Sequence, residues 1–292
     1  MKKAGMINTS ISLVCREPQK DLNTHTVIAS IRVTPDGFSY ALFNPDTNQY
    51  YQLESFDLQG ITNEERWIET LQKLFEEHPI IREKYAKTYL QWAFPGALLV
   101  PAPLYTPQKK ELYFKYNHYT SPKQLIHEDP LPTFDAVLLY PIASEIDQFL
   151  HTVFPQAIRT HHLSSLLLIL EKAYCSDQSS TQLFVQVHKN NFDLIVFHQK
   201  KLQFLNSFPY KTAEDFLYFL LLTMKTLSLD PETQKVTFLG TIASDAALTQ
   251  KIAKYIRHIT FITKSAFDHF SEAFDQMEEH LFFNLLNQKN CE

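Results

Sequence analysis

Glycine is scarce in this sequence compared with its usual frequency in proteins. The chain has five glycines in 292 residues, where average usage of about 7% would give about twenty. Gly5, Gly37, Gly60, Gly96 and Gly240 stand far apart. Walker, dinucleotide and kinase phosphate loops need glycines a few residues apart, because their backbone must approach the phosphate closely. The spacing therefore excludes these motifs and the G-x-S-x-G elbow of hydrolases.

Concentrated positive charge and paired cysteines are also missing. The net charge is −5, the sequence pI is about 6.2, and no basic run suggests a surface that neutralises nucleic acid. Cys15, Cys175 and Cys291 are far apart and form no C-x-x-C pair, which argues against a disulfide framework and a zinc site. We therefore expect no nucleic-acid partner and a reducing, cytoplasmic location.

Long hydrophobic runs are absent as well. The longest, Leu166–Leu170 and Phe216–Leu222, fall far short of the roughly 20 residues that cross a bilayer. Polar residues interrupt the first apolar stretch too often for a signal peptide. With 45% hydrophobic and 20% charged residues, the composition predicts a globular protein of about two domains without membrane insertion.

The first part of the chain follows a definite order of predicted elements. Alternating apolar residues predict a three-stranded meander, and Asp36-Gly37 predicts its first hairpin turn. A helix, a strand buried on both faces and a second helix are expected to follow. In chain order these elements are Thr26–Val33, Phe38–Phe43, Tyr50–Phe56, a helix from Thr62, a strand Ala97–Val100 and, after a further buried run Ala136–Tyr140, a helix from Ser144.

The same order recurs after the turn-forming segment Ser176–Ser180. It comprises strands beginning near Leu183, Phe192 and Leu202, a helix from Thr212, a strand Val236–Leu239 and a helix from Ser244. A last helix is expected from Ser265, because apolar residues then recur three and four apart; they are Phe267, Phe270, Phe274, Met277 and Leu281. We divide the chain into an N-terminal arm (1–23), a first half (24–178) and a second half with the C-terminal helix (179–292).

This doubled order resembles the actin-like ATPase superfamily. The residues that carry the resemblance are Val27–Phe43 around Asp36-Gly37, Ala136–Phe149 and Leu183–Gly240. The sequence is similar to a small uncharacterised bacterial family with that fold, akin to the actin-like proteins of pilus assembly and cell division. The resemblance implies an α/β fold of two similar RNase H-like halves, with the order βββαβα twice.

In that superfamily, a phosphate-binding turn follows the first strand of each half, and a third glycine-rich turn holds the adenosine. The corresponding segments here are Arg32–Phe38, Gln186–Asn191 and the turn at Gly240. Pro35 lacks an N–H, no acid ends the first strand, and the second turn contains neither glycine nor acid. We therefore expect no catalytic residue and no cofactor. If a cleft is retained, its candidates are Arg32, Asp36, Gly37, His188, Lys189, Asn190, Gly240 and Thr241.

Most polar candidates also have an ordinary local explanation. Asp36 fits a turn residue better than a metal ligand, and His188 and Lys189 fit a solvated turn better than an anion site. The neighbours His161 and His162 are expected to diverge, so no metal site is predicted. The aromatic segment Glu111–Tyr119 predicts either a surface patch or a domain interface.

Three functions remain open from the sequence. The leading hypothesis is a non-catalytic scaffold or interaction module with a protein partner. The alternatives are a nucleotide-binding ATPase or phosphotransferase with unconventional phosphate-binding turns, and a small-molecule or peptide sensor that uses the cleft between the halves. A scaffold predicts a cleft filled by side chains, whereas a sensor predicts a pocket with converging polar groups.

Overall fold

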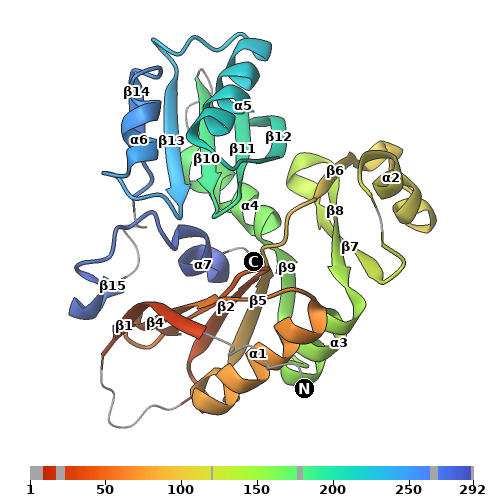
Figure 1. The fold of residues 1–292 in the computed structure, drawn as a ribbon, viewed down its shortest axis with the longest axis vertical. Coiled ribbons are helices and arrows are strands. Elements are labelled where there is room, and N and C mark those ends of the chain that lie inside the picture. Colours follow the sequence, from red (N-terminus) through yellow and green to blue (C-terminus); the bar gives the residue numbers. More distant parts are fainter. Residues whose placement is uncertain (1–8, 18–23, 120, 176–179, 264–268, 291–292) are drawn as a thin grey trace, which may run out of the picture.

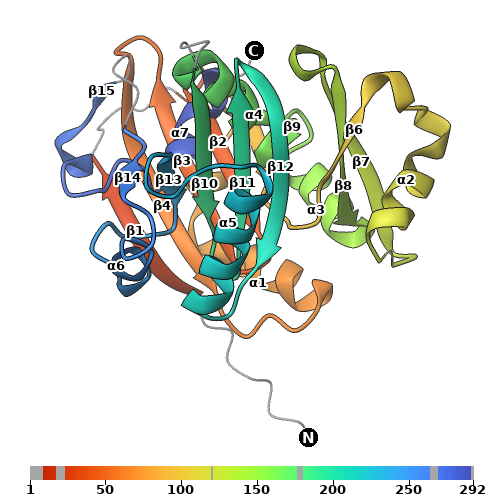
Figure 2. The same cartoon turned by 90° about the horizontal axis from the view of Figure 1, so that it is seen from above.

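The computed structural model describes residues 9–17, 24–119, 121–175, 180–263 and 269–290. Two halves are stacked along the long axis of the molecule, and a smaller sheet projects from the side of the first half (Figure 1). Seen from above, the smaller sheet stands apart from the sheets of both halves (Figure 2). The molecule is an α/β protein of two similar units with one insertion.

The first half is built on a seven-stranded sheet. Six strands follow the order β1-β4-β3-β2-β5-β9, and the seventh, β15, pairs with β4. Its strands are β1 (Thr9–Arg16), β2 (Ile28–Thr34), β3 (Gly37–Asn44), β4 (Gln49–Leu58), β5 (Lys87–Trp92), β9 (Ile158–His161) and β15 (His269–Phe270). Strands β2, β3 and β4 form the predicted meander, and β5 and β9 join it in parallel. The described part of the N-terminal arm is also a strand of this sheet, because β1 pairs with β4.

The turn between β2 and β3 consists of Pro35 and Asp36. The predicted hairpin is confirmed, but neither Asp36 nor Gly37 has the positive φ that the common Asp-Gly hairpin turn requires. Space is tight at position 37: a Cβ there would lie 3.0 Å from Thr34 Oγ1 and 3.2 Å from the carbonyl oxygen of Phe56. Proline supplies the φ of the first turn position.

Helices α1 (Glu64–Glu77) and α3 (Ser144–Val153) cover one face of this sheet. Their apolar sides form one core with the strands; its buried members include Val33, Phe38, Trp67, Leu71, Phe75, Trp92, Ile146 and Leu150. The N-cap of α1 is Asn63, one residue after the predicted Thr62, and its side chain accepts a hydrogen bond from the backbone N–H of Arg66 at 2.9 Å. Capping satisfies one of the free N–H groups of the first turn.

The central parallel strand of the first half is β5, and its predicted position at Ala97–Val100 is wrong. The strand was missed because the polar residues Lys87, Thr88 and Gln91 interrupt its apolar run. Gln91 is nevertheless fully buried, since its face of the sheet meets other polar side chains rather than an apolar helix. A rule that identifies central strands by continuous apolar runs cannot find such a strand.

The segment Ala97–Val100 belongs instead to an inserted unit. Strand β6 (Leu98–Pro101) is one edge of a three-stranded antiparallel sheet with the order β6-β8-β7, where β7 is Gln124–Leu131 and β8 is Ala136–Ala143. Helix α2 (Lys110–Asn117) packs on it through Phe114. Tyr116 and Tyr119, from the aromatic segment of the sequence, are 80% and 94% exposed, so this part of the segment lies on the surface.

The second half repeats the plan with a five-stranded sheet in the order β12-β11-β10-β13-β14. Its elements are β10 (Thr181–Val187), β11 (Asn191–His198), β12 (Lys201–Pro209), α5 (Ala213–Thr226), β13 (Lys235–Gly240), α6 (Ala247–Ile252) and β14 (His258–Phe261). The predicted meander and the Thr212 cap are confirmed, the latter as a complete capping box with Asp215. The apolar run Phe216–Leu222 nearly encircles α5 and would predict burial on two sides, but Tyr218 and Leu222 are exposed.

Each half sends its last helix to the other half. Helix α4 (His162–Tyr174) follows β9 of the first half but packs on the second sheet, where Leu166 and Leu170 meet Phe184 and Ile195. Helix α7 (Phe283–Asn287) ends the second half and contacts β2 and β3 of the first. Both lie at the junction in Figure 1. The exchange ties the halves together through apolar packing.

The predicted long C-terminal helix is wrong. Residues 264–268 lie outside the described chain, and the segment after them forms β15, a 3-10 turn and only then α7. Phe270, Phe274, Met277 and Leu281 still share one apolar surface, since they pack on the first sheet around Phe43, Tyr50 and Leu53. Within the described residues, short 3-10 helices are formed by Pro79–Arg82, Ala102–Leu104, Pro107–Lys109, Pro132–Phe134, Glu272–Phe274 and Gln288–Asn290.

None of the helices that the structure describes combines the length and the apolar character that crossing a bilayer requires. The longest, α1 and α5, have 14 residues each, against roughly 20 for a span.

Replacing Gly240 by alanine should destabilise the fold strongly. Gly240 ends β13 with φ +91°, and an added Cβ would lie 2.3 Å from the carbonyl oxygen of Val187. Strained backbone costs about 1–3 kcal/mol, and the clash adds to it, so we expect a loss of about 3 kcal/mol or more in the free energy of unfolding. Gly60→Ala is the matched control, because φ is +70° but nothing lies within 4 Å; it should cost about 1–2 kcal/mol. Equal shifts in urea midpoints would contradict the role of the contact.

Candidate functional site

Polar side chains line the two sheet faces that meet at the junction of the halves. On the first sheet, Arg32 lies directly opposite Ser39 on one neighbouring strand and opposite Gln91 on the other. On the second sheet, Asp193 lies opposite Gln186 and Ser207 in the same way. Directly opposite residues project from the same face. Arg32, Gln91, Gln186 and Asp193 are all buried, so these polar rows form an internal site.

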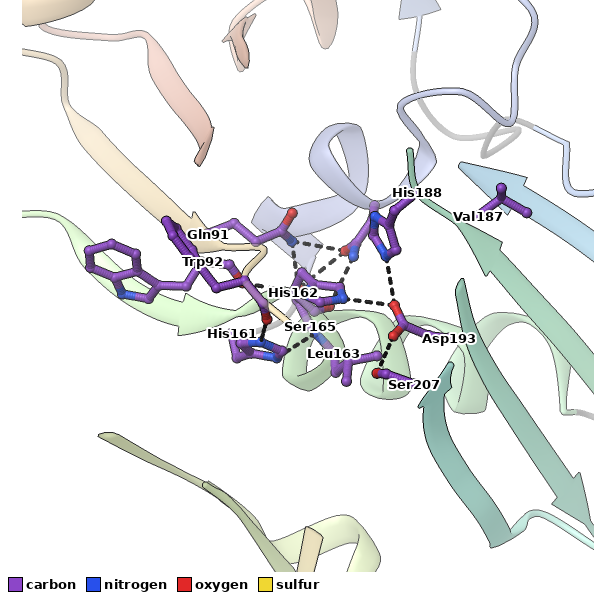
Figure 3. Close-up of polar contacts among 12 residues, drawn as sticks. Gln91, Trp92, His161, His162, Leu163, Ser165, Val187, His188, Asp193 and Ser207 are labelled. Atoms are coloured by element: carbon purple, nitrogen blue, oxygen red, sulfur yellow. Dashed lines mark hydrogen bonds and ion pairs between the residues drawn. The ribbon is translucent and has the colours of Figure 1, made fainter. Parts of the chain in front are cut away.

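Asp193 is the centre of this site (Figure 3). Its Oδ2 accepts hydrogen bonds from His188 Nε2 at 2.7 Å and from His162 Nε2 at 2.9 Å, while the hydroxyl of Ser207 donates to Oδ1. His162 is the first residue of α4 and His188 follows β10. A fully buried carboxylate is thereby satisfied by donors from a helix end, a hairpin and a neighbouring strand, as burial of a charge requires.

Arg32 completes a connection between the halves. Its Nη2 lies 3.0 Å from Nδ1 of His188. A guanidinium group can only donate, so Nδ1 is the acceptor and Nε2 carries the hydrogen that His188 donates to Asp193. This tautomer makes His188 a neutral bridge between a cation of the first sheet and an anion of the second. We call Arg32, His188 and Asp193 the junction bridge.

The pKa shifts of the three groups agree with this assignment. Burial opposes ionisation of Asp193, but His188 and His162 together hold its pKa well below the usual range. Burial also lowers the pKa of His188, against the attraction of Asp193. Burial lowers the pKa of Arg32 to about 10, with Asp193 and Asp36 opposing the shift. At neutral pH the bridge is therefore cation, neutral imidazole and anion.

Helix α7 closes the same space from the other side. Gln91 Nε2 donates to Ser165 Oγ at 2.8 Å and to Asn284 Oδ1 at 2.9 Å. Asn284 Nδ2 in turn donates to the backbone oxygen of His162 at 2.9 Å. Side chains of the first sheet, α4 and α7 thus fill the centre of the junction.

The sequence candidates divide into two groups. Arg32 and His188 meet in the junction bridge, and the expected solvated turn is wrong for His188, whose side chain is 11% exposed. Lys189 is exposed as expected, and its Nζ lies 3.8 Å from Asp36 Oδ2. Asp36 also accepts a hydrogen bond from Thr34 Oγ1 at 3.0 Å, in keeping with its predicted turn role.

The remaining candidates are held by backbone contacts. Gly37 belongs to β3 and Asn190 is exposed in the second turn, where its carbonyl oxygen accepts from Tyr210 N at 3.0 Å. Gly240 N donates to the carbonyl oxygen of His280 at 2.9 Å, and Thr241 N donates to that of Val187 at 2.8 Å. The backbone donors of the third turn are therefore already bonded within the protein.

The sequence reasoning missed Asp193, His162 and Ser207. It also expected the rings of His161 and His162 to diverge, which is wrong: their centroids lie 4.3 Å apart, because His161 Nδ1 accepts from Leu163 N and caps α4. A signal for Asp193 was present. Asp193 is an acid in a strand whose apolar residues occupy both faces. Both faces of such a strand are buried, so the carboxylate has no access to solvent.

Two hollows lie outside the junction bridge, whose three residues line neither of them. The larger, about 830 Å³, opens between the first half and the inserted unit; its lining includes Pro35, Asp36, Leu58, Ile61, Trp67, Phe94, Pro141, Ile146 and Lys189. We call it the lateral cleft. The smaller, about 240 Å³, lies between the inserted unit and β12 and includes Asn117, His118, Asn206 and Ser207. Only the first falls within the roughly 300–1,000 Å³ of typical ligand pockets.

A protein family accounts for most of this chain. The family described as "Protein of unknown function (DUF3822)" matches residues 19–259. The chain belongs to the DUF3822 family. Among curated proteins, no sequence matches this DUF3822 chain.

Solved structures show its fold. A protein from Bacteroides thetaiotaomicron VPI-5482 with an actin-like ATPase fold and unknown function is 21% identical; the match covers 82% of this chain and 91% of that one, with a TM-score of 0.72. A chain of the PilM-PilN type IV pilus biogenesis complex is 11% identical over 90% of this chain and 98% of that one, with a TM-score of 0.60. The DUF3822 chain has the actin-like ATPase fold, as the resemblance implied.

That fold implies a nucleotide with a magnesium ion, and the residues present do not fit them. Phosphate-binding turns offer free backbone N–H groups, but here Gly240 N, Thr241 N and His188 N are bonded to carbonyl oxygens of the chain. Magnesium prefers oxygen ligands, whereas the junction offers two imidazoles and one carboxylate. The guanidinium of Arg32, a group suited to phosphate, is already bonded to His188.

The junction bridge should show strong energetic coupling between Arg32 and Asp193. Asp193→Asn should cost about 3–5 kcal/mol, because it leaves Arg32 buried without its counter-charge. Adding Arg32→Met should recover part of that loss, with a coupling of about 1–3 kcal/mol in a double-mutant cycle measured by urea unfolding. The control cycle uses the exposed pair Glu214 and Lys251 and should show no measurable coupling. Additive losses at the bridge would contradict it.

Proposed function

We propose that this DUF3822 protein is a non-catalytic interaction module that presents the lateral cleft to a partner protein. The observation that carries the proposal is the junction bridge. It joins Arg32 of the first sheet to His188 directly, between the two turns that would otherwise hold phosphates. Because the chain's own side chains fill the space between these turns, a nucleotide cannot bind there, while the actin-like fold is retained.

The bridge also favours a fixed arrangement of the halves. Opening the junction would separate Arg32 from Asp193 and expose the core in which α4 packs on the second sheet. Removing one partner of a buried charge pair costs about 3–5 kcal/mol. A nucleotide that opened the junction would have to offset this free energy by its own binding. A scaffold needs no such opening, and a rigid junction suits it.

The lateral cleft has the chemistry of a peptide-binding surface. Phe94 and Ile61, both half-buried, contribute apolar surface to its wall, and Asp36 and Lys189 place opposite charges on its rim. An apolar centre within a polar rim is typical of protein interfaces. The PilM neighbour, solved in a PilM-PilN complex, supports the idea that this fold can serve a protein partner. We infer an extended segment with apolar side chains as the occupant.

A small-molecule sensor is the second candidate, since the volume of the lateral cleft suits a compact ligand. The cleft is wide and lies between two sheets, which favours an extended chain over an enclosed ligand. The two functions differ in what the cleft captures: a crosslink to a protein segment supports the interaction module, and saturable binding of a metabolite supports the sensor.

Magnesium and ATP should leave the thermal unfolding of the protein unchanged. Ligand at a hundredfold excess over its dissociation constant would add about 2.7 kcal/mol of stability by mass action, and for a chain of this size that shifts the melting temperature by several degrees. Differential scanning calorimetry with ATP, ADP and the magnesium salt alone provides the measurement and its control. A saturable shift with nucleotide would favour the ATPase alternative.

A photocrosslinking residue at Phe94 should yield one discrete adduct with a partner protein in the cells that carry this chain. The same residue at Tyr218, exposed on α5, is the control and should not. Ala143→Trp, which puts a large side chain at a half-buried lining position, should abolish the adduct while circular dichroism stays unchanged. An adduct equally strong at both positions, or one insensitive to Ala143→Trp, would contradict cleft binding.

A further inference from the structure

We propose that His162, His188 and Asp193 form a binding site for one divalent transition-metal ion of the zinc class, and that Arg32 opposes the ion. This goes beyond the proposed function and concerns the junction rather than the lateral cleft. The sequence alone predicts no metal site, because the neighbouring histidines His161 and His162 are expected to diverge. The fold instead brings one histidine from α4 to another beside β10.

The geometry is close to that of a metal site before the ion enters. The ligand atoms of the three residues all lie within 4.8 Å of one another, and both imidazole Nε2 atoms point at the same carboxylate oxygen, at 2.7 and 2.9 Å. Tetrahedral zinc with bonds of about 2.0–2.1 Å places its ligand atoms about 3.3 Å apart. An outward shift of about half an ångström would therefore admit the ion.

The donor set selects the class of ion. Two imidazole nitrogens and one carboxylate oxygen suit zinc, cobalt(II) and related first-row ions, whereas magnesium and calcium take sets of oxygens. The site is largely closed to solvent: Asp193 is 0% exposed, His162 is 2% exposed and the side chain of His188 is 11% exposed. A deprotonated carboxylate and neutral imidazoles are the forms in which these residues bind metals.

The surroundings match a metal site at two of the three ligands. Nδ1 of His162 faces the backbone oxygen of Trp92 at 3.3 Å, the partner that metal-bound histidines commonly have. Ser207 donates to the second oxygen of Asp193 and leaves Oδ2 for the ion. Gln186, on the same sheet face as Asp193, has a buried Oε1 with no hydrogen-bond partner among the described residues. That oxygen is a candidate fourth ligand.

Arg32 is the group that works against the ion. It donates to Nδ1 of His188, so the hydrogen of this imidazole is on Nε2, the atom that must bind the metal. Binding requires the hydrogen to move to Nδ1, which removes the acceptor for Arg32 and places two cations close together. The ion therefore competes with the junction bridge, and metal occupancy and the link between the halves exclude one another.

Cobalt(II) tests the site because its visible absorption reports ligand type and coordination number. The full chain, treated with a chelator and then titrated, should bind one cobalt ion, and zinc should displace it. His162→Gln and His188→Gln should each weaken cobalt binding by about a hundredfold or more, since each removes a ligand. The matched control is His118→Gln, which should leave the titration unchanged. His118 is a partly exposed histidine at the C-cap of α2.

Arg32→Met provides a test that keeps all three ligands. It removes the opposing cation and frees Nδ1 of His188, so cobalt affinity should rise by about tenfold or more, the scale of effects from groups behind metal ligands. A purely structural cluster predicts no gain. The proposal is overturned if the wild type binds no stoichiometric cobalt, if the histidine variants bind it equally well, or if Arg32→Met gains nothing. Circular dichroism of each variant shows that the fold is intact.

Discussion

The structure depends on the need to compensate two charges buried at the junction. Arg32 and Asp193 stand on different sheets, and each would be costly to bury alone. His188 joins them because one of its nitrogens accepts from the guanidinium while the other donates to the carboxylate. The arrangement works only when the two sheets face each other in one register. A local hydrogen-bond requirement therefore fixes how the halves are placed.

Apolar packing reinforces that placement. Helix α4 leaves the first half and covers the second sheet, while α7 returns from the second half to the first. Each half thus completes the core of the other. The polar bridge and the exchanged helices act on the same junction, so the opening that a nucleotide cycle would need has to break both at once.

The actin-like fold by itself says little about chemistry, because function resides in the site rather than in the architecture. In this member of the DUF3822 family, the backbone N–H groups of His188 in the second turn and of Gly240 and Thr241 in the third are bonded to the chain's own carbonyl oxygens. Side chains occupy the space between the turns. The lateral cleft remains open: the inserted unit contributes to its lining, and the half-buried Phe94 lines it together with the rim residues Asp36 and Lys189.

The sequence by itself determined the elements whose signals are local. Alternation along Leu183–Val187, the cap at Thr212 and the hairpin turn predicted at Asp36-Gly37 depend on neighbours in the chain, and the two meanders followed from them. Tertiary structure decided the rest. Strand β5 carries polar residues because its face meets the junction, the apolar residues from Phe270 to Leu281 pack on a sheet instead of forming a helix, and His162 reaches His188 only when α4 crosses to the second half. A contact between residues far apart in the sequence produces no periodic pattern along the chain. Neither residue alone identifies the partner whose hydrogen bond compensates its burial.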